Sequence, residues 1–281
     1  MANIFEEIDN QLIGFNKDIS VRLKEQTENY IKKFQSTDEV YNKHIQLKKI
    51  HVFRVLKEIN DLCTDLNVPE NVRYCAHVLA MLHDIGRFEQ YHKYRTFADA
   101  KTENHSEIAI RITEEQGFIK DLSFDMKSLV YKAILNHNIP RIIPGHPRVL
   151  DLLSRLLRDA DKLDIWRVAL EHDVWHTIEN YSRDTNYSVP DNIMNCFIQH
   201  RTVPIELAPT LADSYLLRIS WIFDINFKPS FVKINSRNIV SRFLAKFFST
   251  DEIQKIERIT EEFIQEKLNS VSVLVSNPVY I

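Results

Sequence analysis

The sequence predicts an all-α protein, and three observations lead to that prediction. The chain has 281 residues but only 4 glycines, so long stretches pass without the residue that most often interrupts a helix. A few prolines, 9 in all, punctuate these stretches. Apolar residues recur three and four positions apart in several segments, which is the spacing of a helix with one buried face. We therefore expect a single all-α domain over residues 1–281.

The first elements follow from this spacing. Residues 16–36 are polar with scattered apolar positions and predict a helix on the outside of the domain. Residues 44–62 are apolar at most inward positions and predict a largely buried helix. The segment Asn67-Val68-Pro69-Glu70 predicts a helix start, because proline suits the first turn and an acid stands beside it. That helix should run to His83-Asp84, with Gly86 as its stop.

The following segments alternate between loops and helices. Residues 87–104 are mixed and rich in aromatic residues, and we expect a loop with short helical pieces there. A helix is expected over residues 102–117, where Gly117 stands just past its end. Ser123 or Asp125 caps the next helix, which runs to His137.

The C-terminal half remains helical in its pattern. Residues 144–147 predict a turn, and residues 149–163 predict a strongly amphipathic helix. Beyond these, the clearest helical patterns cover residues 211–224 and 251–268. The tail over residues 271–281 is β-branched and predicts one extended segment.

Composition and charge exclude several classes of protein. The 36 basic and 39 acidic residues give a net charge of -3, so neither binding to a nucleic-acid duplex nor a polybasic membrane patch is expected. The N-terminus lacks the basic and apolar regions of a signal peptide, and the longest apolar runs are too short to span a membrane. Cys63, Cys75 and Cys196 fit neither a disulfide framework nor a zinc site. We therefore expect a cytoplasmic protein with reduced cysteines.

His83 and Asp84 are the most informative residues, because they follow the apolar run over residues 78–82. Burying two ionisable groups without partners costs several kcal/mol. A divalent metal is a suitable partner, since imidazole and carboxylate are common metal ligands. Any single histidine in a helix is more often a hydrogen-bonded residue than a ligand, so the prediction depends on a set. Four further residues complete that set: His51, His105, His137 and Asp161.

The set resembles the H…HD…D signature of the HD-domain superfamily of metal-dependent phosphohydrolases. The residues that match this signature are His51, the pair His83-Asp84, and Asp161. Their neighbours are also typical of the superfamily, over residues 51–55, 82–87 and 159–164. The resemblance covers residues 44–166. It implies a bundle of helices around a metal site, with the HD core at about residues 44–180. The helical pattern of the remaining residues predicts a helical C-terminal extension at about residues 181–281.

Some members of this superfamily hold two metal ions and have two extra histidines between the HD pair and the final aspartate. His105 and His137 stand in that interval. The resemblance then implies that one ion is held by His51, His83, Asp84 and Asp161. The second ion would be held with the help of His105 and His137, and Asp84 would bridge the two ions. In the single-ion alternative, these two histidines contact the ligands or the substrate instead. The ligand types suit Mn, Fe, Ni, Co, Zn or Mg.

The expected chemistry is an attack by hydroxide on phosphorus, because a divalent ion lowers the pKa of its water from about 15.7 toward about 7. Asp84 is the central catalytic residue of this scheme. Cations near the pocket would stabilise the developing charge, and Arg87 and Lys101 are the first candidates, followed by Lys162. Asp99 is a candidate for orienting water or a cation, or for capping a helix.

The predicted function is hydrolysis of a phosphomonoester, a phosphodiester or a nucleotide, with a small phosphorylated substrate as the partner. No oligomeric state is predicted. Two alternatives stay open, a mononuclear nucleotide phosphatase and a non-catalytic nucleotide-binding module that signals to another protein. The Gly-Tyr-Pro segment of the cyclic-dinucleotide branch is not found after His137. A second His-Asp pair, His172-Asp173, with His176 one turn later, breaks the superfamily order and is interpreted as surface or pocket rim.

Overall fold

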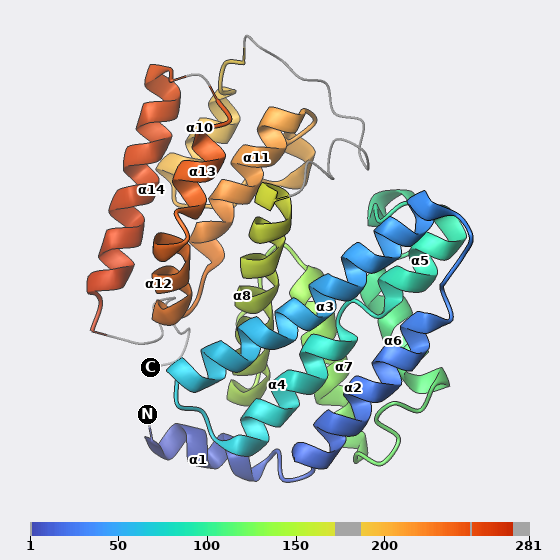
Figure 1. Cartoon of the computed structure of the whole chain (residues 1–281). Helices are drawn as coiled ribbons and strands as arrows, with labels where there is room; N and C mark the ends of the chain where they lie inside the picture. Colours follow the sequence, from blue (N-terminus) through green and yellow to red (C-terminus); the bar gives the residue numbers. More distant parts are fainter. Residues whose placement is uncertain (1, 172–186, 248, 272–281) are drawn as a thin grey trace. The chain divides into compact units, whose positions relative to one another are not determined.

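The protein is described by a computed structural model of residues 2–171, 187–247 and 249–271, and its regular elements are helices (Figure 1). No strand occurs among these described residues, which confirms the predicted all-α class. The contacts within the chain divide it into two compact units, Met1–Asp161 and Lys162–Ile281. The single domain with an extension from about residue 181 stays a prediction.

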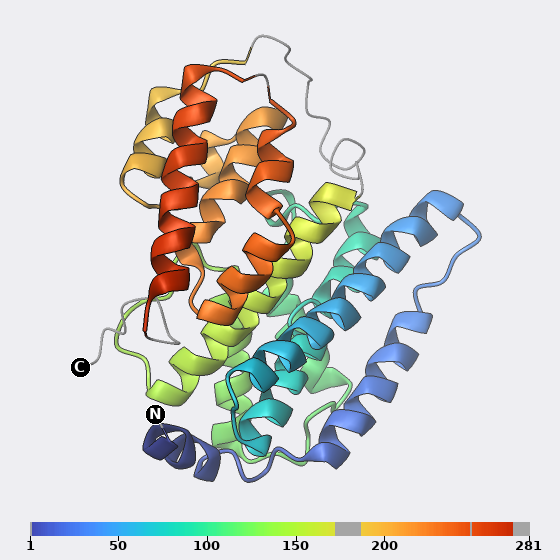
Figure 2. The ribbon, with the colours of Figure 1, turned by 60° about the vertical axis from the view of Figure 1, so that its left-hand side comes forward.

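The N-terminal unit begins with helices that pack around α4. In chain order they are α1 (Ala2–Asn10), α2 (Lys17–Lys32), α3 (Glu39–Asp65) and α4 (Glu70–Leu82). α4 packs against both α2 and α3, and Figures 1 and 2 show the three helices side by side. α2 begins at Asn16, whose side chain accepts a hydrogen bond from the backbone of Ile19. α4 begins directly after Pro69, as the sequence predicts.

The second half of this unit contains α5 (Gly86–Tyr94), the 3-10 turn η1 (Asp99–Lys101), α6 (His105–Glu115) and α7 (Phe124–Asn138). α6 packs against both α5 and α7, and α7 also packs against α4. Asn104 caps α6 and Ser123 caps α7, each through a side-chain oxygen that accepts a backbone N–H. Gly117 follows the end of α6 with a φ of 62°, a left-handed conformation that glycine adopts without strain.

Two predictions for residues 82–104 are wrong. Residues 86–94 form the continuous helix α5 instead of a loop with short helical pieces. Phe88 packs on Phe34, Tyr91 packs on Tyr41 of α3, and α5 as a whole packs on α6, so tertiary contacts stabilise a segment whose many polar residues hide its periodicity. Gly86 does not stop the preceding helix, because α4 ends at Leu82 and Gly86 is the first residue of α5. α6 also starts three residues later than expected, at the residue after the Asn104 cap.

α8 (Arg148–Glu171) contains the division between the two units. The C-terminal unit continues with α10 (Asp191–Ile198), η2 (Ile205–Leu207), α11 (Leu211–Ser220), η3 (Trp221–Asp224), α12 (Lys228–Ser236), α13 (Ile239–Leu244) and α14 (Asp251–Asn269). α14 packs against α10, α12 and α13. The helical segments predicted over residues 211–224 and 251–268 are therefore present. Residues 272–281 of the predicted extended tail lie outside the described part of the chain.

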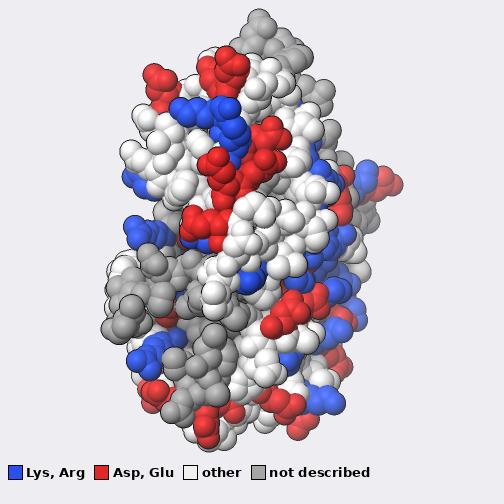
Figure 3. Space-filling view, turned by 90° about the vertical axis from the view of Figure 1, so that its left-hand side faces the viewer, with Lys and Arg blue, Asp and Glu red and all other residues white. Residues whose placement is uncertain are grey.

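The outer face of α14 carries charged side chains of both signs. The sequence of this helix alternates acidic residues with Lys255, Arg258 and Lys267. Figure 3 shows these two signs interspersed over the face that contains α14. None of the described helices has the length and apolarity needed to cross a membrane.

The core of the N-terminal unit is densest at the end of α4. Every residue from Val78 to Leu82 is fully buried, and the partner face of α3 contributes Val52 and Val55, also fully buried. His83 and Asp84 directly follow this buried run, and they are buried as well: His83 is fully buried and Asp84 is 3% exposed. The fold therefore carries an ionisable pair into its interior.

His77, on the same helix, links three helices through its imidazole ring. Its Nδ1 lies 3.1 Å from the Ser20 hydroxyl on α2, and its Nε2 lies 3.2 Å from Oδ1 of Asn60 on α3. Burial, together with the nearby Arg73, lowers the pKa of His77 to about 4. The ring is thus neutral in the native state at neutral pH, with Nε2 donating to the amide oxygen.

This hydrogen-bonded ring makes stability depend on pH. We expect the free energy of unfolding to fall between about pH 6.5 and about pH 4, because the unfolded chain protonates His77 and the native state does not. The slope from this one group is at most about 1.4 kcal/mol per pH unit. Urea unfolding at a series of pH values should therefore show a shallower dependence for His77→Gln, whose amide does not titrate. Equal slopes for the two proteins would contradict the expectation.

Candidate metal centre

All six residues predicted as metal ligands meet in one buried cluster of the N-terminal unit. They come from five different elements: His51 from α3, His83 and Asp84 from the turn after α4, His105 from α6, His137 from α7 and Asp161 from α8. Residues far apart in the sequence are therefore brought together by the packing of the helices. The second pair, His172-Asp173, and His176 lie outside the described residues.

One half of the cluster is formed around Asp161. Nε2 of His51 lies 3.1 Å from Oδ1 of Asp161 and 3.4 Å from Oδ2 of Asp84. Nε2 of His83 lies 3.7 Å from the same Asp161 oxygen and 3.9 Å from the same Asp84 oxygen. Ligand atoms of His51, His83 and Asp161 all lie within 4.8 Å of one another.

The other half is formed around the second oxygen of Asp84. Nε2 of His105 lies 3.4 Å from Oδ1 of Asp84 and 3.1 Å from Nε2 of His137. Ligand atoms of His83, Asp84 and His137 form a second group within 4.8 Å. Asp84 thus turns Oδ2 toward His51 and His83, and Oδ1 toward His105. This is the arrangement expected of a carboxylate placed between two ion positions.

Two observations show that the cluster suits a metal ion: the separations between its ligand atoms, and a buried nitrogen atom without a hydrogen-bond partner. Bonds of about 2.1 Å that meet at right angles separate two ligand atoms by about 3.0 Å, close to the shortest separations found here. Nε2 of His83 is buried and has no hydrogen-bond partner among the described residues. Leaving such an atom unsatisfied costs about 1–3 kcal/mol, and an ion would remove that cost.

Three of the histidines are oriented by hydrogen bonds from their Nδ1 atoms. The acceptors are the backbone oxygen of Ala80 for His83 (2.9 Å), the backbone oxygen of Ile134 for His137 (2.5 Å), and Oδ2 of Asp99 for His105 (2.6 Å). Because these oxygens accept only, each Nδ1 carries the hydrogen. The lone pair of each Nε2 then faces the cluster, as metal binding requires.

The imidazoles of the second half are neutral at neutral pH. Burial lowers the pKa of His137 to about 3, and the neighbouring His105 and His83 add to this effect. Burial, together with the nearby Arg87, also lowers the pKa of His105. Neutral imidazole is the form that binds a metal.

The carboxylates are ionised in spite of their burial. Burial alone would raise the pKa of Asp84, but Lys48 and the His83 and His51 imidazoles outweigh it and hold that pKa well below its usual range. For Asp161, burial is likewise outweighed, in this case by the two imidazoles beside it. The second half of the cluster therefore combines the neutral nitrogen donors of His105 and His137 with the negative oxygen donor of Asp84, a set that suits a divalent ion.

Asp99 connects the second half of the cluster to Arg87. Its Oδ2 accepts from His105, and its Oδ1 accepts from Nη1 of Arg87 (2.7 Å) and from the amide of Gln90 (2.9 Å). Nε of Arg87 donates to Oδ1 of Asp84 at 3.3 Å. Asp99 thus orients a cation, one of the roles weighed for it from the sequence, and it also anchors a candidate ligand.

The predicted phosphate-binding cations lie in different surroundings. Arg87 lies beside the cluster, and its Nη1 donates to the backbone oxygen of Phe97 (2.6 Å) and to Oε1 of Gln90 (2.9 Å) as well as to Asp99. Lys101 lies on η1 with its side chain exposed. Lys162 is buried and pairs with Asp224 at 2.7 Å within the C-terminal unit. A contact of Arg87 or Lys101 with phosphate stays a prediction.

Sequence reasoning missed Lys48, which contributes the shortest ion pair to Asp84. Its Nζ lies 2.9 Å from Oδ2 of Asp84. The available signal is its position three residues before His51 on α3, a spacing that places both side chains on the same face of a helix.

Arg158 was also missed, and it joins the two helices that carry His137 and Asp161. Its guanidinium donates to the backbone oxygens of Asn136 (2.8 Å) and Ile139 (2.6 Å) at the end of α7. A cation suits this position, because the last carbonyl groups of a helix lack partners within the helix.

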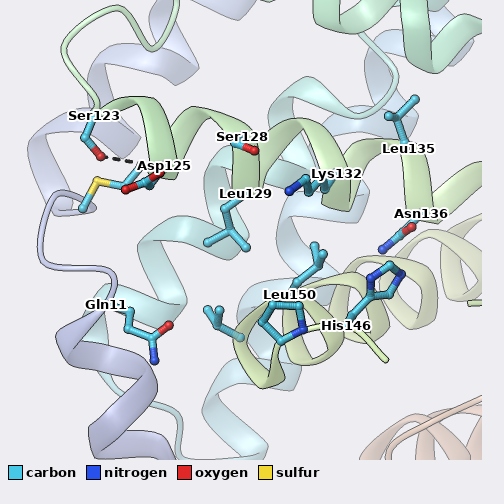
Figure 4. A pocket seen from close by; sticks show the side chains of 13 residues that line it. Gln11, Ser123, Asp125, Ser128, Leu129, Lys132, Leu135, Asn136, His146 and Leu150 are labelled. Atoms are coloured by element: carbon cyan, nitrogen blue, oxygen red, sulfur yellow. Dashed lines mark hydrogen bonds between the residues drawn. The ribbon is translucent and has the colours of Figure 1, made fainter. Parts of the chain in front are cut away.

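A separate pocket of about 710 Å³ lies on another face of α7 (Figure 4). Ser123 and Asp125 stand at one end of it, and Asn136 and His146 stand at the other. No candidate ligand lines this pocket. It is therefore distinct from the metal centre, although Asn136 directly precedes His137 in the chain.

Comparison with known proteins gives one match. The family model for the HD domain matches residues 49–166, a span that contains all six clustered residues. No curated protein and no solved structure matches the chain.

Gly86 allows α5 to approach the start of α6 closely. A Cβ atom at this position would lie 2.3 Å from the backbone oxygen of His105 and 2.7 Å from the backbone nitrogen of Ala109. Both are backbone atoms, so relief of the clash would require α6 to move. The side chain of His105 would move with it.

We therefore expect Gly86→Ala to destabilise the protein by about 1–3 kcal/mol in urea unfolding. The sign is informative, because alanine is otherwise favoured over glycine within a helix. Gly117→Ala is the control, since a side chain is strained there by a φ of 62° but would meet Lys120 only at ordinary contact distances of 3.6 Å or more. A Gly86→Ala protein as stable as the native one would show that α6 can shift freely.

Proposed function

Because the family model for the HD domain matches residues 49–166, we propose that the chain is a member of the HD-domain superfamily and a metal-dependent phosphohydrolase acting on a small phosphate ester. The observation that carries the proposal is the pair of Asp84 oxygens, of which Oδ2 faces His51 and His83 while Oδ1 faces His105. A structural ion site needs no such division, whereas a two-metal phosphohydrolase site holds its ions about 3.5–4 Å apart.

We further propose that both positions bind a divalent ion. His51, His83, Asp84 and Asp161 would hold the first, and Asp84, His105 and His137 would hold the second. The neutral imidazoles of His105 and His137 support the second position, since their Nε2 atoms lie only 3.1 Å apart. Mixed nitrogen and oxygen ligands suit Mn, Fe, Co, Ni or Zn better than an all-oxygen set would.

The residues of the chain have separate tasks in this mechanism. When bound, the ions lower the pKa of water and neutralise charge on the phosphoryl group. Asp84 is ionised and would contribute a ligand to both positions. Asp99 fixes the ring of His105, and Arg87 ties Asp84 to Asp99 while adding a positive charge beside the cluster. Burial limits the water around these groups, which strengthens each electrostatic contact.

The substrate class and the compartment follow as parts of the same proposal. A site built for phosphoryl chemistry takes a small phosphorylated molecule, and the mixed charges seen in Figure 3 offer no broad basic face there for a nucleic-acid duplex. The cysteines Cys63, Cys75 and Cys196 are free and buried, which suits a reducing compartment such as the cytoplasm.

The proposal predicts that Asp84→Asn abolishes both metal binding and hydrolysis. Activity would be measured with Mn²⁺ on a panel of phosphomonoesters, phosphodiesters and nucleotides, and should fall by more than about 100-fold. Bound metal would be quantified on the same samples. Asp121→Asn, at an exposed ion pair with Arg22, is the control and should change neither quantity. Full metal content and full activity in Asp84→Asn would refute the proposal.

The second ion position predicts a change in metal count. His105→Gln should lower the bound Mn²⁺ from two ions per chain to one, because the first group of ligands remains intact. His92→Gln removes an exposed histidine outside the cluster and should leave the count at two. A native protein that binds one ion, with no change in His105→Gln, would favour the mononuclear alternative.

A further inference from the structure

Lys48 places an ammonium group at the edge of the cluster. Its Nζ lies 2.9 Å from Oδ2 of Asp84, the same oxygen that faces His51 at 3.4 Å. The contact joins α3 to the turn after α4, and it is made from the same face of α3 that carries His51. The ammonium therefore lies next to the position proposed for the first ion.

The surroundings of Lys48 fix the position of the ammonium but do not use all of its hydrogen-bond donors. The ring of Phe97 lies 5.3 Å from Nζ and attracts the cation through its face. Asp84 supplies the one hydrogen-bond acceptor found for Nζ among the described residues. Since an ammonium has three N–H donors, further donors remain for an incoming oxygen atom. The side chain is 17% exposed, so that atom can arrive from solvent.

Arg87, the other cation at the cluster, is placed differently. Its Nη1 already donates to three protein oxygens, among them Oδ1 of Asp99. Its guanidinium is planar and fixed by this network, whereas the lysine ammonium ends a flexible chain of four carbons. Lys48 can therefore follow a ligand over a short distance, and Arg87 is held in place.

We infer that Lys48 binds the phosphoryl group of the substrate, an inference that rests on the proposed phosphohydrolase function. Asp84 shares its charge with the ions when the site is loaded, so the neighbouring ammonium becomes available to a negative phosphoryl oxygen. Lysine is a frequent phosphate ligand in proteins because its charge is compact and strongly hydrogen-bonding. Lys48 joins Arg87 and Lys101 as a candidate phosphate ligand, and unlike the exposed Lys101 it contacts Asp84 directly.

A different role would use the same contact. Lys48 could act only as a replacement for the first ion, neutralising Asp84 until metal arrives. The two roles predict opposite outcomes when the charge is removed. Loss of a phosphate ligand weakens phosphate binding and leaves metal binding unchanged, whereas loss of a competing cation strengthens metal binding and leaves phosphate binding unchanged.

The test is Lys48→Gln, which keeps a hydrogen-bond donor for Asp84 but removes the charge. The affinity of the Mn²⁺-loaded protein for inorganic phosphate would be measured by calorimetry, alongside the Mn²⁺ affinity of the metal-free protein. We expect phosphate affinity to fall about 10-fold to 100-fold, with Mn²⁺ content and affinity within about twofold of the native protein. Lys48→Arg should recover part of the lost phosphate affinity.

Lys43→Met is the matched control, because Lys43 is exposed on the same helix. It should bind phosphate and Mn²⁺ as the native protein does. Thermal unfolding would verify that each variant is folded, and Lys48→Met provides a second neutral variant should Lys48→Gln unfold.

Unchanged phosphate affinity in Lys48→Gln, with or without tighter Mn²⁺ binding, would overturn the inference. The outcome is separable from a failure of the proposed function. A native protein that binds no Mn²⁺ and hydrolyses no ester refutes the function itself. A native protein that does both, with a Lys48→Gln variant that binds phosphate normally, refutes only the role of Lys48.

Discussion

The ionised carboxylate of Asp84 is the constraint on which the N-terminal unit depends. α4 brings it to the end of a run of fully buried residues, where a charge without partners would cost more than the fold can supply. Neighbouring side chains compensate this buried negative charge. Lys48 and Arg87 supply positive charge, and His51 and His105 direct ring nitrogens toward its two oxygens. These partners come from α3, α5 and α6, so three helices are held in place by their contacts with Asp84.

The network around Asp84 is continuous from the candidate ligands to the loop after α5. Arg87 connects Asp84 to Asp99, and Asp99 connects to His105. Gly86 lets α6 lie close enough to α5 for these contacts to form, because glycine has no side chain that would clash with the backbone of His105. The short segment from His83 to Arg87 thus contains two candidate ligands, a cation and the glycine that sets the spacing of α5 and α6.

Much of this could be predicted from the sequence, for identifiable reasons. The helices with clear caps or clear periodicity are present, as shown by Ser123 at the start of α7 and Gly117 after α6. The six clustered residues were all predicted, since their order and local context are distinctive. Helix α5 was missed because its stability comes from packing on α6, which no local pattern records.

The partners of the cluster were harder to predict than the ligands. Lys48 is an ordinary surface-type residue in an amphipathic helix until the position of Asp84 is known. Arg158 gives no sign in the sequence that it joins two helices, because its acceptors are backbone oxygens. Such contacts depend on how helices meet in space, and the chemistry of the side chain alone does not specify them.

The cluster draws its six residues from five elements, and this has a consequence for the amount of folded protein. An ion bound there would act as a cross-link between helices that otherwise meet largely through apolar contacts. Binding to the native state alone adds about 2.7 kcal/mol of stability when free metal exceeds its dissociation constant by about 100-fold. The supply of metal in a cell would then set how much of the chain survives unfolding and proteolysis, as well as how much of it is active.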